Sequence, residues 1–116
     1  MEGITAAVML KAMDGLSRRM EATAQNIANA GTSNYRPVRV NFDSALKAAA
    51  ENGVDAVLAV QPALTSVSRD QFGEGLRVDL ELASAAMTGG RYATLADLLN
   101  RQMQIDALAI SGSRQS

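Results

Sequence analysis

The first thirty residues place apolar and small side chains at alternating spacings of three and four. This is a seven-residue repeat, and it is typical of a helix with a left-handed packing seam. No proline interrupts residues 3–30. We therefore predict one long helix here, and its seam consists of Ala6, Met9, Met13, Leu16, Met20, Thr23, Ile27 and Ala30.

The positions that flank this seam are mostly small, whereas a self-sufficient two-stranded coiled coil usually carries complementary charges there. This favours a helix that packs closely against more than one neighbour. An ordinary amphipathic core helix explains the same periodicity, so the pattern alone leaves both interpretations open.

A second apolar stripe follows the C-terminal part of the chain, from about Leu80 to Ile110. We predict Asp79 as the N-cap of a helix here, and Glu81 in the first turn suits the helix dipole. The stripe consists of Tyr92, Leu95, Leu99, Met103 and Ile110, and it is widened by Leu98, Ile105 and Leu108. A face this broad favours burial against several partners.

The pair Gly89-Gly90 interrupts this stripe and costs about 1 kcal/mol per glycine relative to alanine. Either the helix bends there, or a neighbouring backbone approaches too closely for a side chain. Residues 111–116 read as a polar tail.

The middle of the chain, residues 31–79, holds both prolines and most of the turn-forming residues. Gly31 to Asn34 is expected to stop the first helix, because glycine and asparagine tolerate the left-handed cap conformation. The alternation of Val38, Val40 and Phe42 with polar residues predicts an extended segment. The remaining predictions are a short helix over residues 43–50, strands over 57–60 and 64–68, and a loop over 70–75.

These patterns predict a mainly α fold with an extended, partly irregular or short-β middle. The segments are an N-terminal coiled-coil helix and turn (1–34), the middle segment (35–78), and a C-terminal helix with a polar tail (79–116). The two long helices are expected to pair as a coiled-coil-like hairpin and to form one domain. A two-helix hairpin cannot cover two broad apolar faces, so we expect an assembly component whose monomer has poor stability.

Composition excludes several classes of chemistry. The chain contains no histidine and no cysteine, so the usual ligands of zinc, haem and iron–sulfur clusters and the usual catalytic nucleophile–base pairs are missing. We expect no enzyme, no metal and no cofactor. Lys and Arg total 11 against 12 Asp and Glu, which gives no excess of positive charge for nucleic acid.

No stretch approaches the ~20 apolar residues that span a bilayer, so we expect no direct membrane insertion. The apolar run Gly3–Leu10 follows Glu2 rather than a basic segment, which makes a poor cleaved signal peptide.

The segment Asn26-Ile27-Ala28-Asn29-Ala30-Gly31-Thr32-Ser33-Asn34-Tyr35 resembles the N-terminal signature of the bacterial flagellar rod, hook and hook-associated proteins. That signature reads roughly Asn-Ile-Ala-Asn-x-x-Thr-x-Gly-Tyr at the end of a heptad helix. Residues 41–47 resemble the proximal (FlgB) type of rod protein. Residues 78–81, 91–92 and 95–100 are similar to the C-terminal helix of that type. The resemblance covers about two thirds of the chain and omits most of residues 50–75.

Two departures from the family leave other assignments open. Relatives commonly have Pro-Gly before the tyrosine, where this chain has Ser33-Asn34. They also usually lack the paired Gly89-Gly90. A rod protein of the FlgC type and a divergent paralogue therefore remain alternatives within the family.

The resemblance implies a non-enzymatic structural subunit of the flagellar basal-body rod, which assembles by helix packing into a helical tube that transmits torque. It implies export through the flagellar type III apparatus without a cleaved signal, and a location in the periplasmic rod. The implied partners are other rod subunits, in homo- and hetero-oligomers, and the membrane-embedded base ring with its rod adaptor protein. The alternative outside the family is a small cytoplasmic helical dimerisation or adaptor module.

Two sets of candidate residues follow. The signature turn comprises Asn26, Asn29, Thr32, Asn34 and Tyr35. Its asparagines are expected to satisfy helix-end carbonyls or a neighbouring subunit's backbone, Thr32 to hold the turn, and Tyr35 to bury its ring with its hydroxyl partnered. Asn34 is expected at positive φ, because it stands where relatives have glycine. A simple helix stop explains the same residues. The candidate assembly seam comprises Met9, Met13, Leu16, Met20, Ile27, Tyr92, Leu95, Leu99, Met103 and Ile110.

Overall fold

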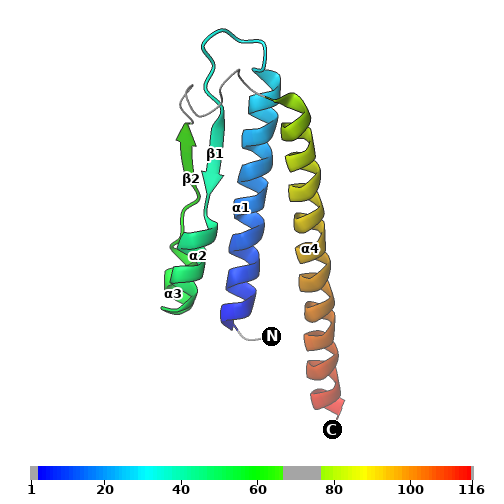
Figure 1. The fold of residues 1–116 in the computed structure, drawn as a ribbon. Coiled ribbons are helices and arrows are strands. Elements are labelled where there is room, and N and C mark those ends of the chain that lie inside the picture. The colour runs from blue at the N-terminus through cyan, green and yellow to red at the C-terminus, as the bar shows by residue number, and fades with distance from the viewer. Residues whose placement is uncertain (1–2, 67–76, 116) are drawn as a thin grey trace.

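The computed structural model describes residues 3–66 and 77–115, the last three of these by their backbone alone. Helix α1 (Gly3–Ala28) is the middle of three layers (Figure 1). Helix α4 (Val78–Gln115) runs antiparallel along one side of it. The other side is covered by β1 (Val38–Asn41), α2 (Asp43–Ala50), α3 (Val54–Leu58) and β2 (Ala63–Ser66). The extents of 67 × 27 × 15 Å describe an elongated molecule, and the predicted mainly helical fold with paired terminal helices is confirmed.

One prediction for the segment between β1 and β2 is wrong. Residues 57–60 were expected to form a strand, but α3 ends at Leu58 and the next strand, β2, begins only at Ala63. A four-residue apolar run does not distinguish a strand from a short buried helix. The choice is made by tertiary contacts, because Val57 is completely buried and the Nζ of Lys11 donates to the carbonyl of Val60 at 2.9 Å.

The extended segment and the short helix that follows it are confirmed as β1 and α2. β1 pairs antiparallel with β2, and Val38 lies opposite Ser66. The strand predicted over residues 64–68 corresponds to β2 as far as Ser66. Residues 67–68 and the loop predicted over 70–75 lie outside the described residues.

α4 differs from its predicted limits at both ends. It begins at Val78, so Asp79 lies inside the first turn and is not the N-cap; its carboxylate instead pairs with Arg77 at 2.6 Å. The helix continues to Gln115, so most of the predicted polar tail is helical. Serine and glycine are weak helix formers, but no proline stops the helix.

The pair Gly89-Gly90 does not interrupt α4. A Cβ atom added at Gly90 would meet no atom within 4 Å, and one at Gly89 would meet only Cε of Met20 at 3.9 Å. The proposed close approach of a neighbouring backbone is therefore wrong within the described residues.

The hydrophobic core lies mainly between α1 and the β1–α2–α3 layer. The buried apolar residues are Ala7, Leu16, Ala22, Val40, Phe42, Leu46 and Val57. Gly15 allows the closest contact, because a Cβ there would lie 2.5 Å from the Phe42 ring. Among the described apolar residues of α4, the half-buried Leu95 packs against this cluster. Both sides of α1 are thus covered, and the uncovered apolar face belongs to α4.

In the part of the chain that the structure describes, no helix combines the length and the apolar character needed to cross a bilayer.

Candidate assembly site

The signature turn is held by hydrogen bonds within residues 25–35. Asn29 donates from Nδ2 to the carbonyl of Gln25 at 2.9 Å, but this carbonyl already accepts the Asn29 backbone N–H at 3.1 Å, so the side chain adds a second bond rather than satisfying an unpaired acceptor. Thr32 donates from Oγ1 to Oδ1 of Asn29 at 3.2 Å, and its backbone N–H donates to the Asn29 carbonyl at 2.9 Å. Asn34 adopts a φ of 62°, which confirms the predicted left-handed conformation. The turn therefore reverses the direction of the chain, so that β1 runs back alongside α1.

Asn26 lies at the centre of a buried polar network. Its side chain is completely buried, and its Oδ1 accepts hydrogen bonds from the Tyr35 hydroxyl and the Val38 N–H, both at 2.9 Å. Its Nδ2 donates to the Val38 carbonyl at 3.0 Å and to Oε2 of Glu81 at 3.3 Å. One amide thus joins α1 to β1 and to the first turn of α4.

The predicted contact of Asn26 with a neighbouring subunit's backbone is wrong, because its amide binds the backbone of its own chain. The reason is geometric. Asn26 lies inside α1 and faces the returning β1 segment, whereas the half-buried Asn29 binds one turn back along its own helix.

Glu81 and Arg39 complete what we call the junction network, which comprises Asn26, Tyr35, Val38, Arg39 and Glu81. The buried Glu81 carboxylate pairs with the Arg39 guanidinium at 2.6 Å. A buried carboxylate is costly unless it is paired and hydrogen-bonded, and here both conditions hold. Sequence reasoning missed both roles, since Glu81 was assigned only to the helix dipole. Glu81 lies seven residues before Thr88 and fourteen before Leu95, so the heptad spacing places it on the face of α4 that packs against α1. This spacing was the available signal for a buried carboxylate.

The network changes the chemistry of Tyr35. Burial, together with the negative charge of Glu81, raises the pKa of the Tyr35 phenol above its ordinary value, and Arg39 partly opposes this. The phenol therefore remains a hydrogen-bond donor to Asn26 over the whole neutral range. This arrangement positions the backbone that follows Tyr35, through the hydrogen bonds of Asn26 to Val38.

The predicted seam is only partly brought together. On α1, Leu16 is buried, and Met9, Met13 and Ile27 are half-buried. Met20 is 40% exposed but lies beside Gly89 of α4.

On α4, Leu95 and Leu99 are half-buried, whereas Tyr92, Met103 and Ile110 are exposed in the single chain, so their assignment to an assembly seam stays a prediction. Leu95, Leu99 and Met103 are separated by two consecutive steps of four residues. Residues that stay against a partner helix need alternating steps of three and four, so Met103 turns away from α1. Ile110 is exposed because it lies beyond the end of α1.

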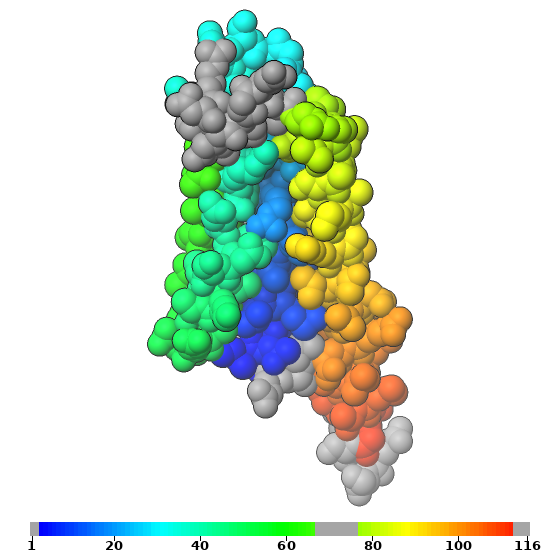
Figure 2. All heavy atoms as spheres, in the orientation of Figure 1, coloured from blue at the N-terminus to red at the C-terminus, as the bar shows by residue number. Residues whose placement is uncertain are grey.

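Most of the exposed large apolar side chains among the described residues belong to α4. They are Val78, Leu80, Leu82, Met87, Tyr92, Leu98, Met103, Ile105, Leu108 and Ile110. The last turns of α4 also project beyond the rest of the molecule (Figure 2). A folded monomer rarely leaves so many large apolar side chains of one helix in solvent, and exposed apolar surface of this kind is typical of a protein interface.

Neither a family model nor a curated protein matches this chain.

Proposed function

We propose that this chain is a structural subunit of the bacterial flagellar basal-body rod, of the proximal type, and that it assembles by helix packing into a tube that transmits torque. Its partners are other rod subunits, the base ring with its rod adaptor protein, and the type III export apparatus. The chain reaches the periplasm without a cleaved signal.

The observation that carries the proposal is the exposed apolar surface of α4. Burying apolar area releases about 25 cal/mol per Å², so a helix that leaves Leu98, Ile105 and Leu108 in solvent gains most when another chain covers them. No comparable gain is available inside the monomer, since α1 is already covered on both sides.

The assignment to the flagellar rod rests on the resemblance of residues 26–35 and on how those residues interact here. Asn26, Tyr35 and Asn34 form the turn that fixes the direction of β1 relative to both helices. A tube of many copies requires this rigidity, because an error in one subunit's geometry accumulates along an open assembly.

A genetic test separates this proposal from the cytoplasmic adaptor alternative. Cells that lack the gene should not swim, and they should regain swimming when the full-length chain is supplied. The supplied chain should leave the cytoplasm only when the type III export apparatus is intact. Normal swimming without the gene would contradict the proposal, as would retention of the chain in the cytoplasm of swimming cells.

A further inference from the structure

Helix α4 faces α1 with a seam that is polar at half of its positions. The facing residues follow one another at alternating spacings of four and three, and all of them except Tyr92 are buried or half-buried. We call them the inner seam, which comprises Glu81, Ala85, Thr88, Tyr92, Leu95, Leu99, Gln102 and Asp106. Among the described side chains of α4, the two that are buried, Glu81 and Thr88, are both polar.

A seam of this composition sets the register of two helices but adds little hydrophobic stabilisation. Leu95 and Leu99 are the large aliphatic side chains of the inner seam, and both are only half-buried. The contact between α1 and the β1–α2–α3 layer, by comparison, buries Leu16, Val40, Phe42, Leu46 and Val57. Separating α4 from α1 therefore costs less hydrophobic free energy than opening this core.

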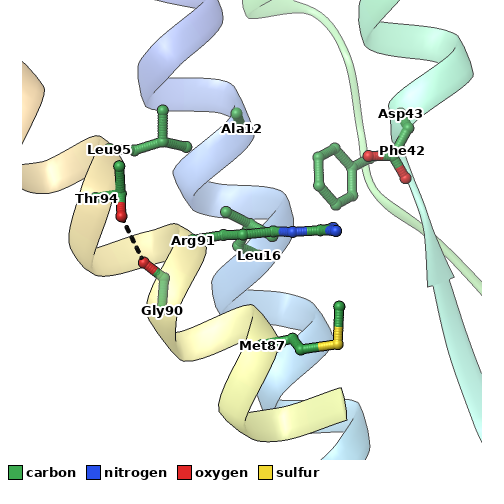
Figure 3. A pocket seen from close by; sticks show the side chains of 9 residues that line it. All are labelled: Ala12, Leu16, Phe42, Asp43, Met87, Gly90, Arg91, Thr94 and Leu95. Atoms are coloured by element: carbon green, nitrogen blue, oxygen red, sulfur yellow. Dashed lines mark hydrogen bonds between the residues drawn. The ribbon is translucent and has the colours of Figure 1, made fainter. Parts of the chain in front are cut away.

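An open groove of about 640 Å³ separates the middle of α4 from the junction of β1 with α2 (Figure 3). Ala12 and Leu16 of α1 form its floor, and Phe42 forms the far wall. Arg91 reaches from α4 toward that wall, but it is exposed and makes no hydrogen bond or ion pair within the described residues. Along this stretch α1 is the element against which α4 packs.

Glu81 attaches the N-terminal end of α4 to two other elements. Its carboxylate accepts a hydrogen bond from Nδ2 of Asn26 in α1 at 3.3 Å and pairs with the guanidinium of Arg39 in β1 at 2.6 Å. The pair of Asp97 and Arg101, in contrast, lies within α4 and is exposed to solvent. Since a buried ion pair is strongly destabilised when one partner is removed, Glu81 contributes more to the docking of α4 than an exposed carboxylate does.

The sequence of α4 also makes it a weak helix once it is separated from α1. Helices in proteins gain most of their stability from packing rather than from propensity. Gly89 and Gly90 lie near the middle of α4, and glycine is the weakest helix former after proline. A released α4 should therefore lose its backbone hydrogen bonds.

We propose that α4 undocks from α1 as a unit while α1 and the β1–α2–α3 layer stay folded, and that Glu81 is the latch that opposes this opening. A part of a protein that contributes few apolar contacts opens at a lower free energy than the whole. The inference concerns the single chain and does not depend on the proposed function. It places the weakness expected of the monomer in α4 and not in α1.

Hydrogen exchange of the purified full-length chain, measured by mass spectrometry of its peptides, tests the opening. We expect amides in residues 84–106 to exchange at least about tenfold faster than those in residues 7–22. Glu81→Ala should speed exchange in residues 84–106 by about tenfold more and leave residues 7–22 nearly unchanged. Asp97→Ala is the matched control, because it removes a carboxylate that pairs with an arginine of the same helix, and it should leave both rates nearly unchanged.

Thiol labelling distinguishes the undocking of α4 from global unfolding. The chain has no cysteine, so a single thiol can be placed at a buried position of either contact. Thr88 of α4 is 4% exposed and Val57 of α3 is 0% exposed. Thr88→Cys should react with a thiol reagent at least about tenfold faster than Val57→Cys, because undocking exposes the first position and only global unfolding exposes the second.

Three results would overturn the inference. Equal exchange in residues 84–106 and 7–22 of the unaltered chain would show that α4 and α1 unfold together. Equal rates for Glu81→Ala and Asp97→Ala, or faster exchange of residues 7–22 in Glu81→Ala, would show that Glu81 is not a latch for α4. Equal labelling of Thr88→Cys and Val57→Cys would show that α4 does not open separately from the core.

Discussion

At the scale of single residues, Asn26 uses both polar atoms of its amide in the junction between α1, β1 and α4. Its Oδ1 accepts two hydrogen bonds and its Nδ2 donates two, and the side chain has no access to solvent. Asparagine is the one side chain of this size that carries both an amide NH₂ with two donors and a carbonyl oxygen acceptor. The identity of the residue is therefore set by the backbone of Val38, whose N–H and carbonyl it satisfies together.

Replacing Asn26 with alanine should lower the free energy of unfolding by about 2–4 kcal/mol, because the Val38 N–H and the Tyr35 hydroxyl lose their acceptor. Urea unfolding followed by circular dichroism measures the loss. Asn29→Ala is the matched control, since the Asn29 amide bonds at the exposed helix end, and it should cost less than about 1 kcal/mol. Equal losses for the two variants would mean that the junction network does not stabilise the fold.

The positive φ of Asn34 sets a second expectation. A β-branched residue strongly resists this conformation, whereas glycine adopts it freely. Asn34→Gly should therefore leave stability almost unchanged, and Asn34→Val should lower it by about 1–2 kcal/mol and weaken assembly. The difference between their urea midpoints is the measurement, and identical midpoints would refute the expectation.

The raised pKa of Tyr35 makes stability depend on pH in the alkaline range. The phenol ionises near its ordinary pKa of about 10 in the unfolded chain and at higher pH in the folded chain. Above pH ~10 the unfolded state therefore binds fewer protons, so the contribution of Tyr35 is complete below that pH and is lost as pH rises through the folded pKa.

Urea unfolding between pH ~9 and ~11 should show this decline in a Tyr92→Phe background and a flatter profile after Tyr35→Phe is added. The same slope in both proteins would show that another group is responsible.

At the scale of elements, the packing of α1 against the β1–α2 junction depends on Gly15. Arg19 stacks over the Phe42 ring, with its guanidinium carbon 4.7 Å from the ring centroid, and bonds to the Asp43 carboxylate at 2.8 Å. The ring is thus held between Arg19 and the backbone of Gly15 and has little freedom to move.

Gly15→Ala should lower stability by about 1–3 kcal/mol, although alanine is the better helix former, because its Cβ would overlap the ring. Gly89→Ala should raise stability by about 1 kcal/mol, because its Cβ meets only an ordinary contact. Thermal unfolding of the two variants measures these opposite shifts. A gain for Gly15→Ala would show that Phe42 moves aside easily.

The elements that local pattern predicts are the ones the sequence analysis placed correctly. α1, β1 and α2 follow from heptad spacing, alternation and a short alanine-rich run, and the signature turn follows from its residue types. α3 was mistaken for a strand because Val57 is placed by contacts with distant segments. The pairing of Asn26 with Glu81 joins positions 55 apart, and no local pattern reports such a contact. In the C-terminal half of α4, Met103 and Ile110 are exposed in the single chain, so their assignment to an assembly seam stays a prediction.

At the scale of the whole molecule, the chain is an elongated slab whose two edges differ. At one edge the β1–α2–α3 segment covers α1, and most of the hydrophobic core lies between them. The other edge is α4, which meets α1 through small, polar and a few apolar side chains and leaves Leu98, Ile105 and Leu108 in solvent. This asymmetry favours a subunit that folds on one side and associates through the other.

We propose that this chain is built into the flagellar rod, and the decisive measurement is electron cryomicroscopy of purified hook–basal bodies from cells that make the chain. We expect density in the proximal rod that fits α1 and α4 as an antiparallel pair, with the β1–α2–α3 layer on the opposite side of α1. A complete rod whose density is fully explained by other chains, in cells that make this chain at normal levels, would contradict it.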